Sequence, residues 1–227
     1  ATWIRPARVH PEWIRCVLRG YDRSMKLASL ALLFLLAPLA HAQQGPPAPD
    51  PAAWAPAGDG LLSRFAGDVD PASPLPEYPR PQLVRERWQS LNGLWAYRIV
   101  GPEPAATDTW DGQILVPYPI ESALSGVGRQ LGPDQTLHYH RTFTVPGDWD
   151  GDRVLLHFGA VDWHARVHVN GMEVGEHRGG YDPFSFDITD VLEVFEDRDE
   201  HVLQVLVTDP TDAGPQPRGK QVAEPHG

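Results

Sequence analysis

Histidines are the residues of this 227-residue chain whose spacing comes nearest to a known chemistry. His138 and His140 lie two residues apart in an expected strand, and His164 and His168 lie four residues apart. Imidazole nitrogens at such spacings bind zinc, but a zinc site needs a third or fourth ligand. The sequence fixes no third ligand, so we expect exposed residues of a strand ladder and no metal site.

The sequence does not support two other motifs, a phosphate-binding glycine loop and the nucleophile of a serine hydrolase. The glycine-rich stretch at 126–128, "GVG", is not followed by the helix that would make it an anion site. The Gly-x-Ser-x-Gly pattern of serine hydrolases does not occur either. The sequence therefore offers no catalytic residue, and we expect no cofactor.

From position 81 onward the chain reads as strands. Short runs with alternating apolar and polar residues are separated by Gly, Pro and Asp about every ten residues. The expected strands cover 93–100, 112–117, 137–146, 153–161, 164–178, 184–189 and 201–209. Seven or more such runs predict an all-β sandwich or jelly roll. Only "DITDVLEVF" predicts a helical turn, with Asp187 or Thr189 as its cap.

The run at 164–178 predicts a β-hairpin. Asn170-Gly171 supplies the positive φ angles of a type I′ turn. The alternation on both sides of the turn assigns the inner face to Val167, Val169, Met172 and Val174 and leaves Glu173 outside.

The N-terminal part carries an expected export signal. Residues 25–42, "MKLASLALLFLLAPLAHA", have a basic start, an apolar run and a small-x-small ending, which is the layout of a secretory signal peptide cleaved before Gln43. The apolar run is too short for the roughly 20 residues of a membrane span. We therefore expect an exported protein, periplasmic or extracellular, and interpret residues 1–24 as a mis-started or upstream extension.

Residues 43–80 are rich in Pro and Ala and predict an extended lead-in.

The net charge of the chain limits the kinds of partner that we expect. Residues 1–42 carry six basic and two acidic side chains, so the formal charge changes from −11 for the whole chain to −15 for the rest. Such an acidic protein repels phosphate backbones and anionic lipid, so we expect no nucleic-acid partner. The one cysteine, Cys16, lies before the cleavage site.

Several motifs after position 81 resemble one family in order and spacing. They are "SLNGLWAYRI", "VPYPIESALSGVG", "YHRTFTVP", "LLHFGAVDWHARVHVNGMEVGEHRGGYDPFSFDITDVL" and "HVLQVLVTDPTD". Residues 81–227 thereby resemble the N-terminal sugar-binding domain of glycoside hydrolase family 2, which includes β-galactosidases, β-glucuronidases and β-mannosidases. The resemblance implies a jelly-roll, galactose-binding-like sandwich at the front of a longer enzyme. An immunoglobulin-like domain and a (β/α)8 barrel with two catalytic glutamates would follow.

The same resemblance implies a domain that is incomplete at its C-terminus. Residues 210–227 predict a loop, so the strand at 201–209 is expected to lack a partner and to leave an open sheet edge with exposed apolar surface. Both barrel carboxylates would lie outside the chain, which by itself is expected to be inactive.

The resemblance also implies sugar-contacting residues. In the β-galactosidase branch an aspartate just past the strand matching "VLQVLVTD" binds a substrate hydroxyl, which places Asp212 first and Asp209 second. Both could equally be turn residues around Pro210. Glu121 and Ser122 lie in a loop near the expected barrel mouth, where Glu121 could instead hydrogen-bond between domains. Pro119 in that loop is a candidate turn proline, in either the cis or the trans form.

Aromatic residues are assigned mainly to packing. Trp88, Trp95 and Trp163 are expected in the core, although Trp163, Tyr181 and Phe184 could also stack on a sugar. The sequence as a whole predicts the sugar-binding domain of an exported retaining β-glycosidase whose partners are a β-glycoside and the enzyme's remaining domains. The alternative is a free-standing carbohydrate-binding module.

Overall fold

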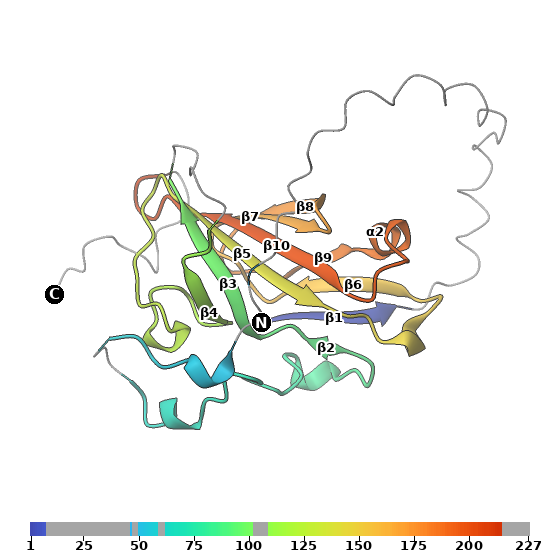
Figure 1. Ribbon diagram of the computed structural model, residues 1–227, viewed down its shortest axis with the longest axis horizontal. Coiled ribbons are helices and arrows are strands. Elements are labelled where there is room, and N and C mark those ends of the chain that lie inside the picture. The colour runs from blue at the N-terminus through green and yellow to red at the C-terminus, as the bar shows by residue number, and fades with distance from the viewer. Residues whose placement is uncertain (8–45, 47–49, 59–61, 102–108, 215–227) are drawn as a thin grey trace, which may run out of the picture.

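The computed structural model describes residues 1–7, 46, 50–58, 62–101 and 109–214 (Figure 1). The expected signal peptide at 25–42, most of the extension at 1–24 and the tail at 215–227 lie outside these described residues.

Ten strands and one short α-helix make up the described part of the chain. The strands are β1 (Thr2–Ala7), β2 (Gln89–Ser90), β3 (Gly93–Val100), β4 (Gly112–Val116), β5 (Thr136–Phe143), β6 (Arg153–Phe158), β7 (His164–Val169), β8 (Met172–Arg178), β9 (Phe184–Asp187) and β10 (His201–Thr208). The helix α2 spans Thr189–Val194. Five 3-10 turns complete the set: η1 (Pro51–Ala53), η2 (Ala66–Asp68), η3 (Pro81–Leu83), η4 (Ala123–Ser125) and η5 (Gly147–Trp149).

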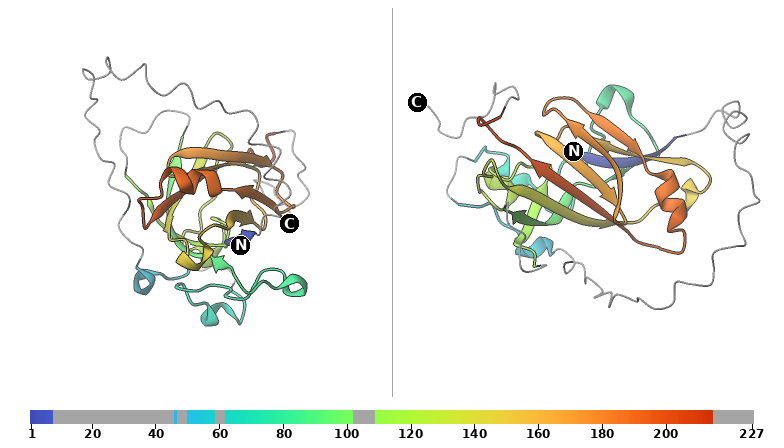
Figure 2. Two further views of the ribbon diagram at one scale, coloured as in Figure 1. Left: turned by 90° about the vertical axis from the view of Figure 1, so that its right-hand side faces the viewer. Right: turned by 90° about the horizontal axis from the view of Figure 1, so that it is seen from above.

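The strands form two antiparallel sheets, and the expected all-β sandwich is confirmed. One sheet has four strands in the order β2-β1-β6-β9, and the other has six in the order β4-β3-β5-β10-β7-β8. β3, β5 and β10 run side by side in the larger sheet, while β1 lies along β6 in the smaller one (Figures 1 and 2). β10 pairs with β5 and with β7, so the expectation that it would lack a partner is wrong.

The core lies between the sheets. Alternate residues of each sheet point inward, among them Trp95, Val167 and Leu203 of the larger sheet and Leu156 of the smaller one, all with at most 1% exposure. Burial of such side chains contributes roughly 1.5–3 kcal/mol each. This apolar interior is what holds the two layers in a fixed relation.

The hairpin is confirmed, with one correction. Asn170 and Gly171 have φ angles of 51° and 82°, as a type I′ turn requires. Val167 and Val169 are fully buried, but Met172 is 44% exposed, so its predicted inward position is wrong. A register irregularity between Val167 and His168 interrupts the β7–β8 pairing, and β8 is an edge strand, so the alternation does not carry across the turn.

The helical turn after β9 is confirmed as α2. The Asp187 side chain accepts a hydrogen bond from the backbone N–H of Thr189 at 3.1 Å, although the residue at the N-cap position is Ile188.

His138 and His140 are not exposed, which corrects the sequence-based expectation. They are 8% and 7% exposed on the outer face of the larger sheet. The indole of Trp110 covers them, with its ring centre 5.4 Å from that of His138 and 5.1 Å from that of His140. A loop residue therefore closes a face that the sandwich itself leaves open.

The strand β1 was not expected at all. It pairs along its whole length with β6, from Thr2–Phe158 to Ala7–Arg153, and at Trp3 and Ile4 with β2. Ile4 is fully buried and Trp3 is 3% exposed. The first seven residues are thus an integral part of the smaller sheet.

Burial of histidines predicts acid sensitivity. Burial, followed by the Arg98 guanidinium and neighbouring imidazoles, lowers the pKa of His138 from 6.5 to about 4. Burial, followed by Arg5 and Arg80, lowers the pKa of His157 to about 4. Because these pKa values are lower in the folded state, stability is lost as the pH falls from 6.5 toward 4. We expect the free energy of unfolding to drop by ~2 kcal/mol per histidine by pH 4.5, measured by urea denaturation. His138→Leu should flatten this dependence, and an unchanged pH profile in that variant would contradict the assignment.

Candidate functional site

A cavity of ≈ 190 Å³ lies between the two sheets at one end of the sandwich. Its walls come from the last residues of β4, β6 and β10, the first residues of β1 and β5, and the loops that follow β4 and β6. Antiparallel pairing brings these strand ends together although they are far apart in the sequence.

Three carboxylates line the cavity. Glu121 comes from the loop after β4, Asp162 from the loop between β6 and β7, and Asp209 directly follows β10. Ionised carboxylates are hydrogen-bond acceptors, and they suit a ligand that offers several hydroxyl groups.

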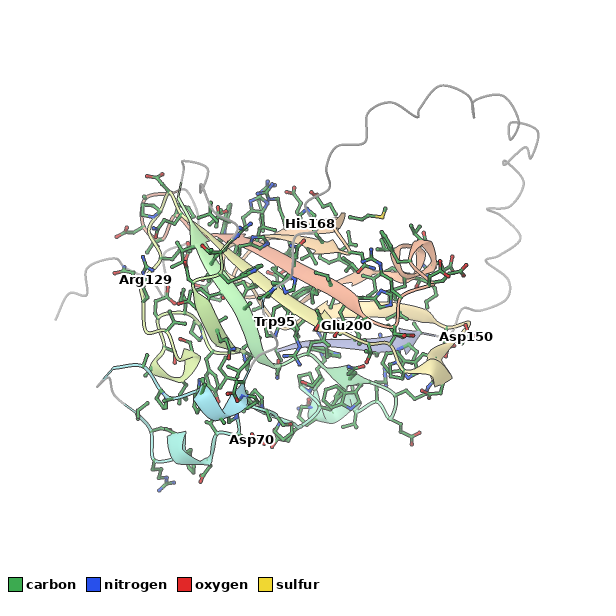
Figure 3. The ribbon with its side chains drawn as sticks, in the orientation of Figure 1. Asp70, Trp95, Arg129, Asp150, His168 and Glu200 are labelled. Carbon is green, nitrogen blue, oxygen red and sulfur yellow. The ribbon has the colours of Figure 1, made fainter. Side chains whose placement is uncertain are left out.

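Aromatic rings form the inner wall. Trp95 and Tyr139 pack edge to face with ring centres 6.2 Å apart. The Trp95 indole N–H donates to the Leu91 carbonyl oxygen at 2.8 Å, which fixes the plane of the ring. Trp95 lies in the interior beside β3, between the two layers (Figure 3). A cavity with a rigid apolar wall and acidic rim can hold a ring that has an apolar face and polar edges.

The tyrosines of the cavity keep their protons. Burial, and after it the negative charge of Glu121, raises the pKa of Tyr139 far above its ordinary value. Burial also raises the pKa of Tyr118. Both phenols are therefore neutral at physiological pH and can donate a hydrogen bond to a ligand oxygen.

The loop between β4 and β5 is shaped by one buried serine. The Ser125 hydroxyl shares its one proton between the carbonyl oxygens of Ser122 at 2.7 Å and Ile120 at 3.1 Å, and it accepts from the N–H of Val127 at 3.0 Å. The side chain is fully buried. It holds the segment that carries Tyr118 and Glu121 to the cavity.

Two cis peptide bonds belong to the cavity loops. They are Val116–Pro117 and Asp162–Trp163, so the cis proline of this region is Pro117, and Pro119, whose isomer the sequence left open, is not among the cis residues. Ser122 caps the turn η4, with its hydroxyl accepting from the Leu124 N–H at 3.2 Å.

The first residues of the chain also reach this cavity. Ala1 and Thr2 line it, and burial lowers the pKa of the Ala1 amino group. The Thr2 N–H donates to the Asn92 side-chain oxygen at 3.1 Å, and the Leu91 N–H donates to the Thr2 carbonyl at 2.8 Å. The cavity thus depends on β1 for part of its wall.

The structure brings two of the three predicted site residues to the cavity. Glu121 and Asp209 line it, whereas Asp212 is half-buried in the turn beyond and is not part of the lining. One Asp209 oxygen also accepts from the Thr211 N–H at 2.8 Å, so this aspartate has a turn role as well. Asp209 therefore lies at the cavity and Asp212 outside its lining.

Asp162 was missed by sequence reasoning. A Cβ atom added at Gly180 would lie 2.3 Å from the Asp162 carboxylate, which is too close for any side chain. Gly180 is therefore needed for the close approach of the two loops. The sequence signal was its place in "AVDWHARV", between two expected strands, but loop aspartates are common and nothing marked this one.

The aromatic residues assigned from the sequence to the core or to sugar stacking do not lie together in the structure. Trp95 is buried as expected, while Trp88 is half-buried and packs edge to face on Tyr78 at 5.0 Å. Trp163 is also half-buried. Phe184 stacks on Phe158 at 4.8 Å, and Tyr181 is 59% exposed, so neither extends the cavity.

Metal ligation is not indicated among the described residues, where no group of three or more His, Cys, Asp or Glu side chains is arranged to hold an ion. The described ranges also include no helix that is long and apolar enough to cross a membrane.

The chain matches known proteins over this region. Residues 113–211 match the family model "Glycosyl hydrolases family 2, sugar binding domain". The resemblance expected from the sequence is thereby confirmed. These residues include Glu121, Asp162 and Asp209.

The relatives match between about a quarter and about half of the chain. A β-glucuronidase of Paenibacillus borealis is 33% identical over 120 residues, which is 50% of this chain and 20% of that protein. A β-galactosidase of Thermoanaerobacter pseudethanolicus is 48% identical over 54 residues, 24% of this chain and 7% of that protein. Among solved structures, a Bifidobacterium dentium β-glucuronidase complexed with coumarin-3-O-glucuronide has 30% identity and a TM-score of 0.41 over 52% of this chain and 19% of that one. The chain spans about a fifth of the length of the curated β-glucuronidases it matches.

The serine that shapes the loop gives a stability prediction. Ser125→Ala leaves the Ile120 and Ser122 carbonyls and the Val127 N–H without their side-chain partner in a buried position. We expect it to lower the free energy of unfolding by about 1–3 kcal/mol in urea denaturation. The matched control is Ser73→Ala, at an exposed position, with a change below about 0.5 kcal/mol. Equal effects of the two substitutions would contradict the role of Ser125.

Proposed function

We propose that this chain is the N-terminal sugar-binding domain of an exported retaining β-glycosidase. The observation that carries the proposal is the cavity that joins Glu121, Asp162 and Asp209 to a fixed aromatic wall, inside the stretch that matches the family model. The two catalytic glutamates of such an enzyme would lie on a barrel domain, with an immunoglobulin-like domain between. In this proposal the fold is a jelly roll, and those two domains are its partners.

The site would act by holding a sugar ring. Carboxylate oxygens accept hydrogen bonds from sugar hydroxyls, and neutral Tyr118 and Tyr139 can donate to ring or hydroxyl oxygens. A ring fixed at several points stands in one orientation relative to the barrel, and such positioning is a large part of the rate enhancement of an enzyme. Asp209 is the preferred hydroxyl-binding residue and Glu121 the second, because both line the cavity.

The proposal predicts binding without hydrolysis. The chain should leave aryl β-glycosides intact, and saturation-transfer NMR with methyl β-galactoside or methyl β-glucuronide at millimolar concentration should show contact with the cavity. Asp209→Asn should weaken binding about tenfold, the cost of one charge-assisted hydrogen bond. Asp212→Asn should have a smaller effect, because Asp212 lies off the cavity.

The matched control for that experiment is Asp150→Asn. Asp150 is an exposed aspartate next to η5, far from Trp95 (Figure 3). Hydrolysis by the chain, or equal losses in the Asp209 and Asp150 variants, would overturn the proposal.

A free-standing carbohydrate-binding module is the second candidate. Exposed aromatic side chains favour it, since Phe65 is 60% and Tyr181 59% exposed, and flat polysaccharides bind to such rings. Pull-down on insoluble glycans separates the two functions, because a module adheres to the polymer through its surface and a domain of a glycosidase does not.

Export is a separate prediction. Expressed with its own N-terminus in a bacterium, the protein should appear outside the cytoplasm with a mass that begins at Gln43. Cleavage there also removes Trp3 and Ile4, whose burial holds β1 in the smaller sheet, so the exported form should denature at lower urea concentration than the whole chain. An exported product that retains Ala1 would contradict the cleavage.

A further inference from the structure

Residues 50–58, which we call the strap, lie against the loop that carries Glu121 to the cavity. The strap begins at the turn η1, where the Asp50 side chain accepts a hydrogen bond from the Ala52 N–H at 2.9 Å. Further along, the Ala57 N–H donates to the carbonyl oxygen of Ala123 in η4 at 2.8 Å. The strap and η4 therefore lie side by side, although they are far apart in the sequence.

Two glycines of the loop make room for the strap. A Cβ atom added at Gly126 would lie 3.0 Å from two ring atoms of Trp54, and one added at Gly128 would lie 3.0 Å from the Ala57 Cβ. Both distances are shorter than an ordinary van der Waals contact between such atoms, so a side chain at either position would push the strap away. The Trp54 ring thus packs directly on the backbone of the loop.

Trp54 acts on the loop through packing. Its side chain is partly buried, and its indole nitrogen is buried without a hydrogen-bond partner in the part of the chain that the structure describes. Because the indole N–H makes no hydrogen bond, it does not stabilise the strap, and the contact with Gly126 is what the ring supplies. A phenylalanine ring can make much of the same contact.

The strap adds an anchor to a loop that is already tied from within. The Ile120 carbonyl oxygen accepts from the Ser125 hydroxyl at 3.1 Å and from the Arg129 N–H at 3.0 Å. Glu121 follows directly after Ile120 and lines the cavity, yet it is exposed. An exposed carboxylate keeps its place only as far as the backbone that carries it is fixed. A loop that moves would have to be ordered when a ligand binds, and this weakens binding.

We propose that Trp54 is a positioning residue of the sugar site, which holds the loop of Tyr118 and Glu121 at the cavity. This inference rests on the proposed function, because the site that the strap supports is the proposed sugar site. The strap lies after Gln43, so cleavage before that residue would leave it in place. The lead-in, which the sequence predicts as an extended segment, thereby gains a part in binding.

Hydrogen exchange and a sugar titration, both followed by NMR, test this role in the whole 227-residue chain produced in the cytoplasm. In Trp54→Ala the amides of Gly126 and Val127, which are hydrogen-bonded within the loop, should exchange about tenfold faster because the loop opens more easily. Amides of the ladder between β5 and β10 should keep their rates, which reports an intact fold. The affinity for methyl β-galactoside should fall about fivefold, since the ligand must now order the loop.

Two further variants make the test specific. Trp54→Phe keeps an aromatic ring on Gly126, so it should restore most of the amide protection and most of the affinity. Phe65→Ala is the matched control, because it removes an aromatic ring of the same lead-in that is 60% exposed. It should change neither the exchange rates of the loop nor the affinity.

The results separate the positioning role from the proposed function. Equal effects of Trp54→Ala and Phe65→Ala on the loop amides or on the affinity would overturn the positioning role, and so would a Trp54→Phe variant that restores neither. Faster exchange that extends equally to the β5–β10 ladder would also contradict it, because the substitution would then destabilise the whole domain. If the chain without substitutions binds no sugar, the proposed function is overturned and the positioning role with it. If it binds sugar and Trp54→Ala binds equally well, the positioning role alone is overturned.

Discussion

The ladder between β1 and β6 is the constraint on which the rest of the structure depends. It joins β2 to β6, and through them the four strands that face the larger sheet. The same strand starts at the cavity, where Ala1 and Thr2 form part of the wall. Loss of this ladder would unpair the facing edges of β2 and β6 and remove Ala1 and Thr2 from the cavity wall, whereas Glu121, Asp162 and Asp209 stand on other elements.

The strands of the larger sheet could be predicted from the sequence alone, whereas β1 and β2 of the smaller sheet could not. Runs of apolar residues bounded by Gly, Pro and Asp mark the six strands of the larger sheet, so their places could be predicted to within a few residues at each end. β2 has two residues and no period. β1 has Pro6 within it, which argues against a central strand. Pro6 is tolerated because β2 pairs only with Trp3 and Ile4, so the edge of β1 facing β2 is unpaired beyond that point.

The candidate site was predictable only where a residue follows a recognisable strand. Asp209 directly follows β10 and Glu121 lies in the loop after β4, and both could be named in advance because these segments resemble the sugar-binding domain of glycoside hydrolase family 2. Asp162 could not, because its approach depends on Gly180, a residue of another loop that closes on it. Long-range contacts of this kind have no local signal, and the same is true of Trp110, which buries His138 and His140.

The electrostatic character of the cavity follows from its position. It lies at the end of the sandwich, where strand ends bring loop carboxylates together over an apolar interior, so acidic groups and aromatic rings meet within one small volume. The negative charge of Glu121 helps to keep Tyr139 protonated, which leaves a hydrogen-bond donor among acceptors. A ligand with both donor and acceptor groups and one apolar face satisfies all of these groups together. An anion, in contrast, would be repelled by the three carboxylates. Any anionic group of a bound sugar would therefore have to point out of the cavity toward solvent or toward basic residues supplied from elsewhere.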